Sequence, residues 1–386
     1  MTPGPEKLLA GRRVVFVLAG EVLGGAERGA LDLARDLTTE HGAAVQVCAL
    51  DGREGRARQV AAEYGIPWTS ARLPWVGSRV QKAASLARFV AHVRGLRPDV
   101  LISATNLPNV VCGLTWRVTG ASLDVWTQND VLGSTRLGRR LFRRALHAAP
   151  LVVTAASHGR DWLVEQFGVD PGRVQLIRGN VELAPAREGR DTWRARLGLE
   201  PDDLAVCMLA HFHTGKDHET LLHAWRLVAD APAPGGRRPV LLLAGRGAGT
   251  ESKVKALAFD LDLHEYVRFP GEVSDVHGLL DASDLAVLSS RSEMLPHALL
   301  EPMAVGLAVA GTDVPGIREA MGEPGEAYLA PPGDARALAE KILLLARDPE
   351  LRARVGSANA EVIRSRQSAE ATSSVYARML SEKLAT

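Results

Sequence analysis

Short apolar runs rich in β-branched residues alternate with amphipathic segments from one end of the chain to the other. In the first half the runs read RVVFVL, AAVQVCAL, DVLIS, LDVWTQ, LVVTA and RVQLI; in the second half they read LAVCMLA, PVLLLAG, YVRFPG, DLAVLSS and GLAVAG. The segments between them carry apolar residues at i, i+3 and i+4, the spacing of a helix buried on one face. Strands that alternate with helices predict an α/β fold built from two doubly wound parallel sheets.

The helical and strand periodicity lapses near RGNVELAPAREGRDTW, where proline, glycine and charged residues take over. We therefore predict a Rossmann-like N-terminal domain over residues 1–183 and a second Rossmann-like domain over residues 184–365. Residues 366–386 have no strand after them, and we expect a C-terminal helix that crosses back to the first domain. Ligands of open parallel sheets bind beyond the carboxyl ends of the strands, so we expect a site in a cleft that the two domains face.

Length and charge refine this picture. The chain has 386 residues, which exceeds the roughly 250–300 residues at which single cores stop growing. Its net charge is only +1, but residues 1–183 hold 23 basic against 16 acidic residues, and residues 64–98 and 131–160 contain no acid. The run RLGRRLFRRALHAA within the second stretch predicts either a solvated helix face or a peripheral contact of residues 133–149 with an anionic membrane or a phosphate-bearing partner. No nucleic-acid-binding module is recognisable.

The remaining composition is that of an ordinary globular protein. The apolar runs are too short to span a bilayer, and no leader-like segment opens the chain, so we expect a cytosolic protein. Three cysteines, Cys48, Cys112 and Cys207, lie far apart in apolar stretches and form no CxxC motif, which predicts buried free thiols.

The first candidate for chemistry is Gly24-Gly25 in LAGEVLGGAERGALDLARDL, directly after a predicted strand. Glycines let the backbone approach a ligand, and the helix that follows from about Ala26 points its free N–H groups at the same place. A phosphate or a sugar oxygen would suit this loop. A simple tight turn is the alternative, and the lack of GxGxxG argues against a dinucleotide site.

The second candidate is Lys216 in MLAHFHTGKDHETLLHAW, in a loop between a strand and a helix, where a lysine suits a diphosphate. His211 and His213 have a known metal-ligand spacing, but no carboxylate motif completes a site, so we favour no metal. The third candidate, Gly245-Arg246-Gly247 in LLLAGRGAGTES, is either a turn over a ligand or an ordinary βα turn.

The fourth candidate is SRSEMLPHALLEPMAVGLAVAGTDVPGIRE. Pro296 fits the first turn of a helix, so Glu293 is expected in the preceding loop and Glu301 inside the helix. The N–H groups near residues 294–298 then form an anion site, flanked by two carboxylates that accept hydrogen bonds from hydroxyls. An anion next to a polyol describes a nucleotide sugar.

At this point the motifs resemble those of the retaining glycosyltransferases of family 4, which have the two-domain GT-B fold. The similar segments are GGAE, KDHETLLHAW, LAGRGAG and SEMLPHALLEPMAVGLAVAGTD, in the family's order and over nearly the whole chain. The resemblance implies that Lys216 and Glu293 are catalytic, with Lys216 balancing the donor diphosphate and Glu293 facing the donor sugar. It also implies donor contacts for Glu301 (the ribose), for the backbone of Met294, Leu295, Pro296 and His297, for Gly24 and Gly25 (the phosphates), and for Gly245 and Arg246 beside the base.

Four departures from the family pattern concern the donor and acceptor. His211 stands where an arginine is usual, Met294 replaces a glycine after the first glutamate, and Pro302 follows Glu301 where alanine is common, which predicts a bent or shortened helix. In the first domain a sugar-facing histidine is replaced by TQNDV. Contacts with the sugar or the acceptor are then expected from Gln128, Asn129 or Asp130.

These features predict a metal-independent, cofactor-free hexosyl or N-acetylhexosaminyl transferase that uses a nucleotide sugar, with UDP-sugars favoured. Asp260-x-Asp262 resembles a metal signature of a different glycosyltransferase fold and is taken as chance. Of the 46 basic residues 39 are arginine, a GC-rich bias that leaves two acceptors open, an aminocyclitol or aminoglycoside-type intermediate and an envelope glycan or lipid-linked acceptor. A nucleotide-sugar epimerase, a phosphorylase of the same fold, a non-catalytic nucleotide-sugar-binding protein and a metal-dependent hydrolase are the alternatives.

Overall fold

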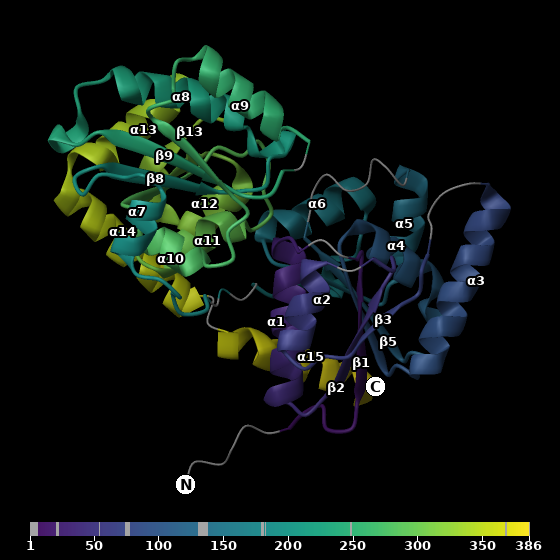
Figure 1. Ribbon diagram of the computed structural model, residues 1–386. Helices are drawn as coiled ribbons and strands as arrows, with labels where there is room; N and C mark the ends of the chain where they lie inside the picture. Colours follow the sequence, from purple (N-terminus) through teal and green to yellow (C-terminus); the bar gives the residue numbers. More distant parts are fainter. Residues whose placement is uncertain are drawn as a thin grey trace, which may run out of the picture. The chain divides into compact units, whose positions relative to one another are not determined.

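The chain forms two compact units in a computed structural model that describes residues 7–20, 23–53, 55–73, 78–129, 138–178, 181, 183–247, 249–366 and 369–385. The first unit takes residues 1–180 together with residues 369–386, and the second takes residues 181–368 (Figure 1). None of the helices in the described ranges is both long and apolar enough to cross a membrane.

The first unit contains a seven-stranded sheet in the order β3-β2-β1-β4-β5-β6-β7, with every pair parallel. Its strands are β1 (Arg13–Leu18), β2 (Ala44–Ala49), β3 (Trp68–Ser70), β4 (Val100–Ala104), β5 (Leu123–Gln128), β6 (Leu151–Thr154) and β7 (Val174–Leu176). Its helices are α1 (Gly25–Thr39), α2 (Arg56–Glu63), α3 (Arg79–Leu96), α4 (Asn106–Thr115), α5 (Arg139–Ala148), α6 (Ser157–Phe167) and α15 (Ala369–Ala385).

Both faces of this first sheet are buried. Val14 and Phe16 of β1 pack into one core, and Val15 and Val17 pack into another on the opposite face. Successive side chains of a strand point to opposite faces, so a strand covered on both sides must be apolar at every position. The run VVFVL meets that requirement.

The C-terminal helix α15 belongs to the first unit. It contributes Tyr376 and Leu380 to the same core as α1, and in Figure 1 the two helices lie side by side. The hydroxyl of Ser373 donates a hydrogen bond to Glu40, 333 residues earlier in the chain, at 2.6 Å.

The second unit contains a six-stranded sheet in the order β10-β9-β8-β11-β12-β13, again with every pair parallel. Its strands are β8 (Leu204–Leu209), β9 (Pro239–Ala244), β10 (Val267–Gly271), β11 (Leu285–Leu288), β12 (Val309–Thr312) and β13 (Leu329–Ala330). Its helices are α7 (Arg190–Arg196), α8 (His218–Asp230), α9 (Glu251–Asp260), α10 (Val276–Asp281), α11 (His297–Ala304), α12 (Pro315–Met321), α13 (Ala335–Arg347) and α14 (Pro349–Arg366). The predicted fold class, two doubly wound parallel sheets, is confirmed.

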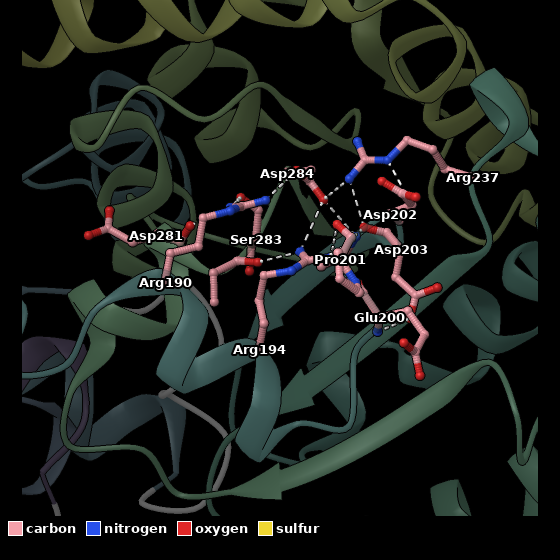
Figure 2. A network of polar contacts seen from close by, with 12 residues as sticks. Arg190, Arg194, Glu200, Pro201, Asp202, Asp203, Arg237, Asp281, Ser283 and Asp284 are labelled. Atoms are coloured by element: carbon pink, nitrogen blue, oxygen red, sulfur yellow. Dashed lines mark hydrogen bonds and ion pairs between the residues drawn. The ribbon is translucent and has the colours of Figure 1, made fainter.

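A polar network fixes the amino-terminal edge of the second sheet (Figure 2). The guanidinium of Arg194, only 5% exposed, donates to the backbone carbonyls of Glu200, Asp203 and Ala282. Asp284, directly before β11, accepts a hydrogen bond from the backbone N–H of Ala205 in β8 at 2.9 Å. The starts of β8 and β11 are therefore held together.

The three cysteines, Cys48, Cys112 and Cys207, are buried and form no disulfide, as their apolar surroundings predicted. Burial raises the pKa of the Cys48 and Cys207 thiols to about 12, so these thiols stay protonated at neutral pH.

Candidate functional site

Charged side chains gather where β8 and β11 end at the carboxyl edge of the second sheet. The two strands are neighbours, so the loop from β8 to α8 and the loop from β11 to α11 lie next to each other. Lys216 lies in the first loop and Glu293 in the second, 77 residues later, and the Lys216 ammonium contacts Glu293 Oε1 at 2.5 Å. The hydroxyl of Ser290 donates to the same carboxylate oxygen at 2.5 Å. The structure thus brings together the two residues predicted to be catalytic.

This cluster is partly shielded from solvent. The side chain of Lys216 is 24% exposed and that of Glu293 is 11% exposed. The Ser290 carbonyl accepts a hydrogen bond from the hydroxyl of Thr312, at the end of β12, at 2.5 Å. The loop that carries Glu293 is therefore tied to a third strand, which limits how far the carboxylate can move from Lys216.

The β8–α8 loop is also tied to the β11–α11 loop directly after Lys216. Asp217 has a left-handed backbone (φ 50°, ψ 49°), and its carboxylate caps α8 by accepting from the backbone N–H of Thr220 at 3.4 Å. The same carboxylate also accepts from the Thr220 hydroxyl at 2.8 Å. Arg291 donates to both oxygens of that carboxylate, from Nε at 2.8 Å and from Nη2 at 3.1 Å. The sequence alone did not assign a role to Asp217, Ser289, Ser290 or Arg291. Their positions in the chain, directly after Lys216 and shortly before Glu293, are the sequence feature that could have indicated one.

The helix that follows Glu293 begins one residue later than predicted. Pro296 is the N-cap of α11, with an extended backbone (φ −79°, ψ 118°), and its carbonyl accepts from the N–H groups of Leu299 and Leu300. His297 is therefore the first helical residue. The first N–H groups of a helix have no acceptor within the helix, and they carry the positive end of its dipole. This arrangement suits an anion beside the loop of Met294 and Leu295.

Glu301 lies inside α11, half-buried, and Glu293 lies in the loop before it, as the sequence indicated. The helix ends at Ala304, two residues after Pro302, so it has the shortened form that this proline predicts. Met294 is only 4% exposed. Its side chain packs into the interior of the second unit.

Gly316, near the start of α12, shows how closely this loop is packed. A Cβ at that position would lie 2.4 Å from the Glu293 carbonyl oxygen and 2.3 Å from that of Met294. Only glycine lets α12 approach the loop to this distance.

His211 lies at the start of the β8–α8 loop, half-buried, with no hydrogen-bond partner for its buried Nδ1 in the described residues. Burial, and next the charge of Arg246, lower the pKa of its imidazole. His211 is thus neutral at pH 7, unlike the arginine that the resemblance implies.

The neighbouring histidines have structural roles. His213 Nδ1 accepts from the N–H of Gly215 at 3.1 Å. The ring of His218 stacks on Phe212 with 4.7 Å between centroids, and its burial lowers the pKa to about 4. Among the described residues, no group of three or more histidine, cysteine or acidic side chains is arranged to hold a metal ion.

The turn after β9 brings the backbone close to the β8–α8 loop. The carbonyl of Arg246 accepts from the N–H of Phe212 at 3.0 Å. At Gly245 a Cβ would lie 2.0 Å from the Ala210 carbonyl oxygen. The glycine is required for this contact, and the side chain of Arg246 is left exposed beside the loop.

The first unit holds the other predicted site residues. Gly24 is the N-cap of α1, its N–H donates to Glu27 Oε2 at 3.1 Å, and the helix begins at Gly25, one residue before the predicted start. Gln128, at the end of β5, is fully buried and accepts from the indole N–H of Trp126 at 2.8 Å. This burial is not what we expected of a residue that contacts a sugar or an acceptor. Asn129 is half-buried, and Asp130 lies outside the described residues.

Two parallel α/β units of this strand order, the second with charged loops at the carboxyl edge of its sheet, define the GT-B class of folds. Two family models match the chain, Glycosyltransferase Family 4 over residues 23–185 and Glycosyl transferases group 1 over residues 189–362. The chain therefore belongs to the family 4 glycosyltransferases.

Curated relatives have low identity to the chain. A D-inositol 3-phosphate glycosyltransferase of Streptomyces bingchenggensis is 28% identical over 60% of this chain and 53% of its own length. The N-acetyl-alpha-D-glucosaminyl L-malate synthase of Bacillus anthracis is 26% identical over 74% of this chain and 72% of its own length. The chain spans about half the length of the D-inositol 3-phosphate glycosyltransferases that it matches.

Solved structures share the whole fold. HepE of Anabaena, crystallised with UDP and glucose, superposes with a TM-score of 0.82 at 19% identity, over 95% of this chain and 99% of that one. Sucrose-phosphate synthase of Thermosynechococcus elongatus gives a TM-score of 0.79 at 18% identity, over 97% and 99% of the two chains.

Proposed function

We propose that this chain transfers a hexose or an N-acetylhexosamine from a UDP-sugar to a hydroxyl group, without a metal ion and with retention of configuration at the anomeric carbon. The observation that carries the proposal is the contact of the Lys216 ammonium with Glu293 beside the first turn of α11. One cation, one helix N-terminus and one carboxylate lie together, which are the groups that a diphosphate joined to a polyol requires.

Each part of the donor has a partner in this arrangement. Lys216 and the first N–H groups of α11 stabilise the charge that develops on the leaving diphosphate, a role that a metal ion fills elsewhere. Glu293 accepts hydrogen bonds from hydroxyls of the donor sugar, and Glu301 accepts them from the ribose. The turn at Gly245 and Arg246 lies beside the base.

The reaction proceeds on one face of the sugar. The bond from the anomeric carbon to the diphosphate oxygen breaks, and the acceptor oxygen forms its bond on the same face. The acceptor proton passes to the departing diphosphate oxygen, so no protein nucleophile is needed. The name of the Streptomyces bingchenggensis relative, a D-inositol 3-phosphate glycosyltransferase, supports the reaction class.

The acceptor is a hydroxyl-bearing molecule, for which two classes remain in the proposal. The names of relatives that act on D-inositol 3-phosphate and L-malate favour a small acceptor such as an aminocyclitol-type intermediate. A lipid-linked envelope glycan is the second class. The basic surface of α5 favours this second class of acceptor. It forms a concavity of about 360 Å³ that is lined by Arg140, Arg143, Arg144 and His147. This basic surface suits a cytosolic protein that rests on an anionic membrane.

Incubation of the protein with a panel of UDP-, GDP- and dTDP-sugars tests the proposal. We expect nucleotide release with at least one UDP-sugar, an acceptor-dependent increase in rate, and no change on adding a strong chelator. Tight donor binding without release would favour a binding protein, and release of an isomerised sugar nucleotide would favour an epimerase. For the membrane contact, we expect binding to vesicles with anionic lipid that an Arg143→Glu, Arg144→Glu variant loses, and no such binding would refute it.

A further inference from the structure

We propose that Arg291 and Asp217 are positioning residues for Lys216. Their ion pair holds the loop that carries Lys216 against the loop that carries Glu293. This inference rests on the proposed function, because it concerns the residue that would meet the donor diphosphate. Neither side chain is itself placed against the donor.

The first support is the set of contacts that surround Lys216. Arg291 donates to the Asp217 carboxylate through two parallel N–H groups, at 2.8 and 3.1 Å, and its backbone N–H donates to the carbonyl of Gly215 at 2.9 Å. The Ser289 hydroxyl lies 2.9 Å from the Lys216 carbonyl oxygen and 3.1 Å from that of Asp217. The residue before Lys216, the residue after it and its own backbone are all held by residues 289–291.

The second support is the backbone of Asp217. A left-handed conformation costs a non-glycine residue about 1 kcal/mol, and Asp217 adopts it at φ 50°. Its carboxylate repays this cost by capping α8 through Thr220 and by binding Arg291. The left-handed turn directly after Lys216 is therefore stabilised by the helix cap and by the bidentate pair with Arg291.

The third support is charge. The side chain of Asp217 is only 2% exposed and follows Lys216 directly. Burial alone would raise the pKa of Asp217, but hydrogen bonds from Arg291 and Thr220 outweigh it, and the pKa lies below its ordinary value. A buried carboxylate next to a diphosphate site repels the ligand unless a cation balances it. Arg291 provides that cation in a geometry that lysine cannot reproduce.

The other end of β8 supplies a matched control. Asp203, directly before the strand, is 4% exposed in its side chain and receives a bidentate pair from Arg238, at 2.9 and 2.5 Å. Asp217 follows the same strand at the opposite edge. Loss of either arginine leaves one buried carboxylate without its bidentate partner, but only Arg291 holds the loop of Lys216.

The test compares Arg291→Ala, Arg291→Lys and Arg238→Ala with the parent protein. For Arg291→Ala we expect the UDP dissociation constant to rise about tenfold and kcat with the donor to fall at least about tenfold. Arg291→Lys should recover part of the UDP affinity, because it restores charge, but less of kcat. Arg238→Ala should lower the melting temperature to a similar extent and leave both constants within about threefold.

A second readout is independent of the reaction. The lysines are reductively methylated with ¹³C-formaldehyde, and the Lys216 signal is assigned as the one missing in Lys216→Arg. We expect its shift to change in Arg291→Ala and to stay fixed in Arg238→Ala. An unchanged signal, or equal kinetic effects of the two arginine variants, would overturn the inference. A parent protein that transfers no sugar while Arg291→Ala still moves the signal would instead reject the proposed function alone.

Discussion

Replacement of Glu293 by glutamine should have different effects on the binding of the donor's diphosphate and on the binding of its sugar. Glutamine has the same shape and its Oε1 still accepts from the Ser290 hydroxyl, but it removes the charge that contacts Lys216 at 2.5 Å. A diphosphate that recruits Lys216 competes with Glu293 for the ammonium. The substitution ends that competition and, at the same time, weakens the acceptor for the sugar hydroxyls.

The substitution should therefore strengthen the binding of UDP but lower kcat/KM for the UDP-sugar. An ion pair with side chains 24% and 11% exposed contributes about 1 kcal/mol, so we expect UDP to bind about fivefold more tightly to Glu293→Gln. The charge-assisted contact that we propose between Glu293 and the sugar is worth about 1.5–3 kcal/mol, so its loss predicts a fall in kcat/KM of roughly 10- to 150-fold.

Isothermal titration with UDP and steady-state kinetics with the UDP-sugar measure the two effects. Glu326→Gln is the control, because Glu326 pairs with Arg318 in the same unit at 2.6 Å and has no role in the proposed site. If Glu293→Gln weakened UDP and the UDP-sugar to the same extent, Glu293 would not be directed at the sugar.

Three further predictions concern single residues. Burial raises the pKa of Asp124 to about 8, so the folded chain keeps a proton on this carboxyl that the unfolded chain releases above about pH 4. The contribution of Asp124 to the free energy of unfolding is therefore fully present below about pH 4 and is lost as the pH rises towards 8. Urea unfolding should therefore show the parent protein losing up to about 1.4 kcal/mol per pH unit relative to Asp124→Asn between pH 5 and 7.5, and parallel curves would contradict this. His211→Arg should tighten UDP binding about tenfold at pH 7.5, because burial lowers the pKa of the histidine and the imidazole is neutral at that pH; an unchanged UDP affinity in calorimetry would count against it. Gly245→Ala should lower both the melting temperature and UDP affinity, because its Cβ would lie 2.0 Å from the Ala210 carbonyl oxygen, whereas Gly189→Ala, with open space around it, should not.

The sequence predicts the long strands of both sheets because β8 and β9, like β1, are apolar at almost every position. It misses β3 and β13, which have three and two residues, although it predicts β7, also of three residues, from the run RVQLI. It also cannot separate the two faces of β5, whose six residues are all buried. Gln128 therefore looked available from sequence although its side chain is enclosed.

The sequence likewise predicts only those features of the candidate site that depend on residues close together in the chain. Glu293 before the helix and Glu301 within it follow from local spacing around Pro296, since capping chemistry acts over a few residues. The contact of Lys216 with Glu293 spans 77 residues and depends on β8 and β11 being neighbours, which sequence patterns do not specify. The resemblance to family 4 suggested both residues, but only the sheet order explains why they meet.

The most direct test of the central claim is the rate of UDP formation from the active UDP-sugar in Lys216→Ala and Glu301→Ala. In the proposed site each substitution removes a charge-assisted contact with the donor, so we predict a loss of at least about 2 kcal/mol of transition-state stabilisation, a fall in kcat/KM of roughly 30-fold or more. Lys341→Ala, which removes a lysine bound to a surface carbonyl of the same unit, should leave the rate unchanged. Near-normal rates in both Lys216→Ala and Glu301→Ala would contradict the assignment of this site to the donor.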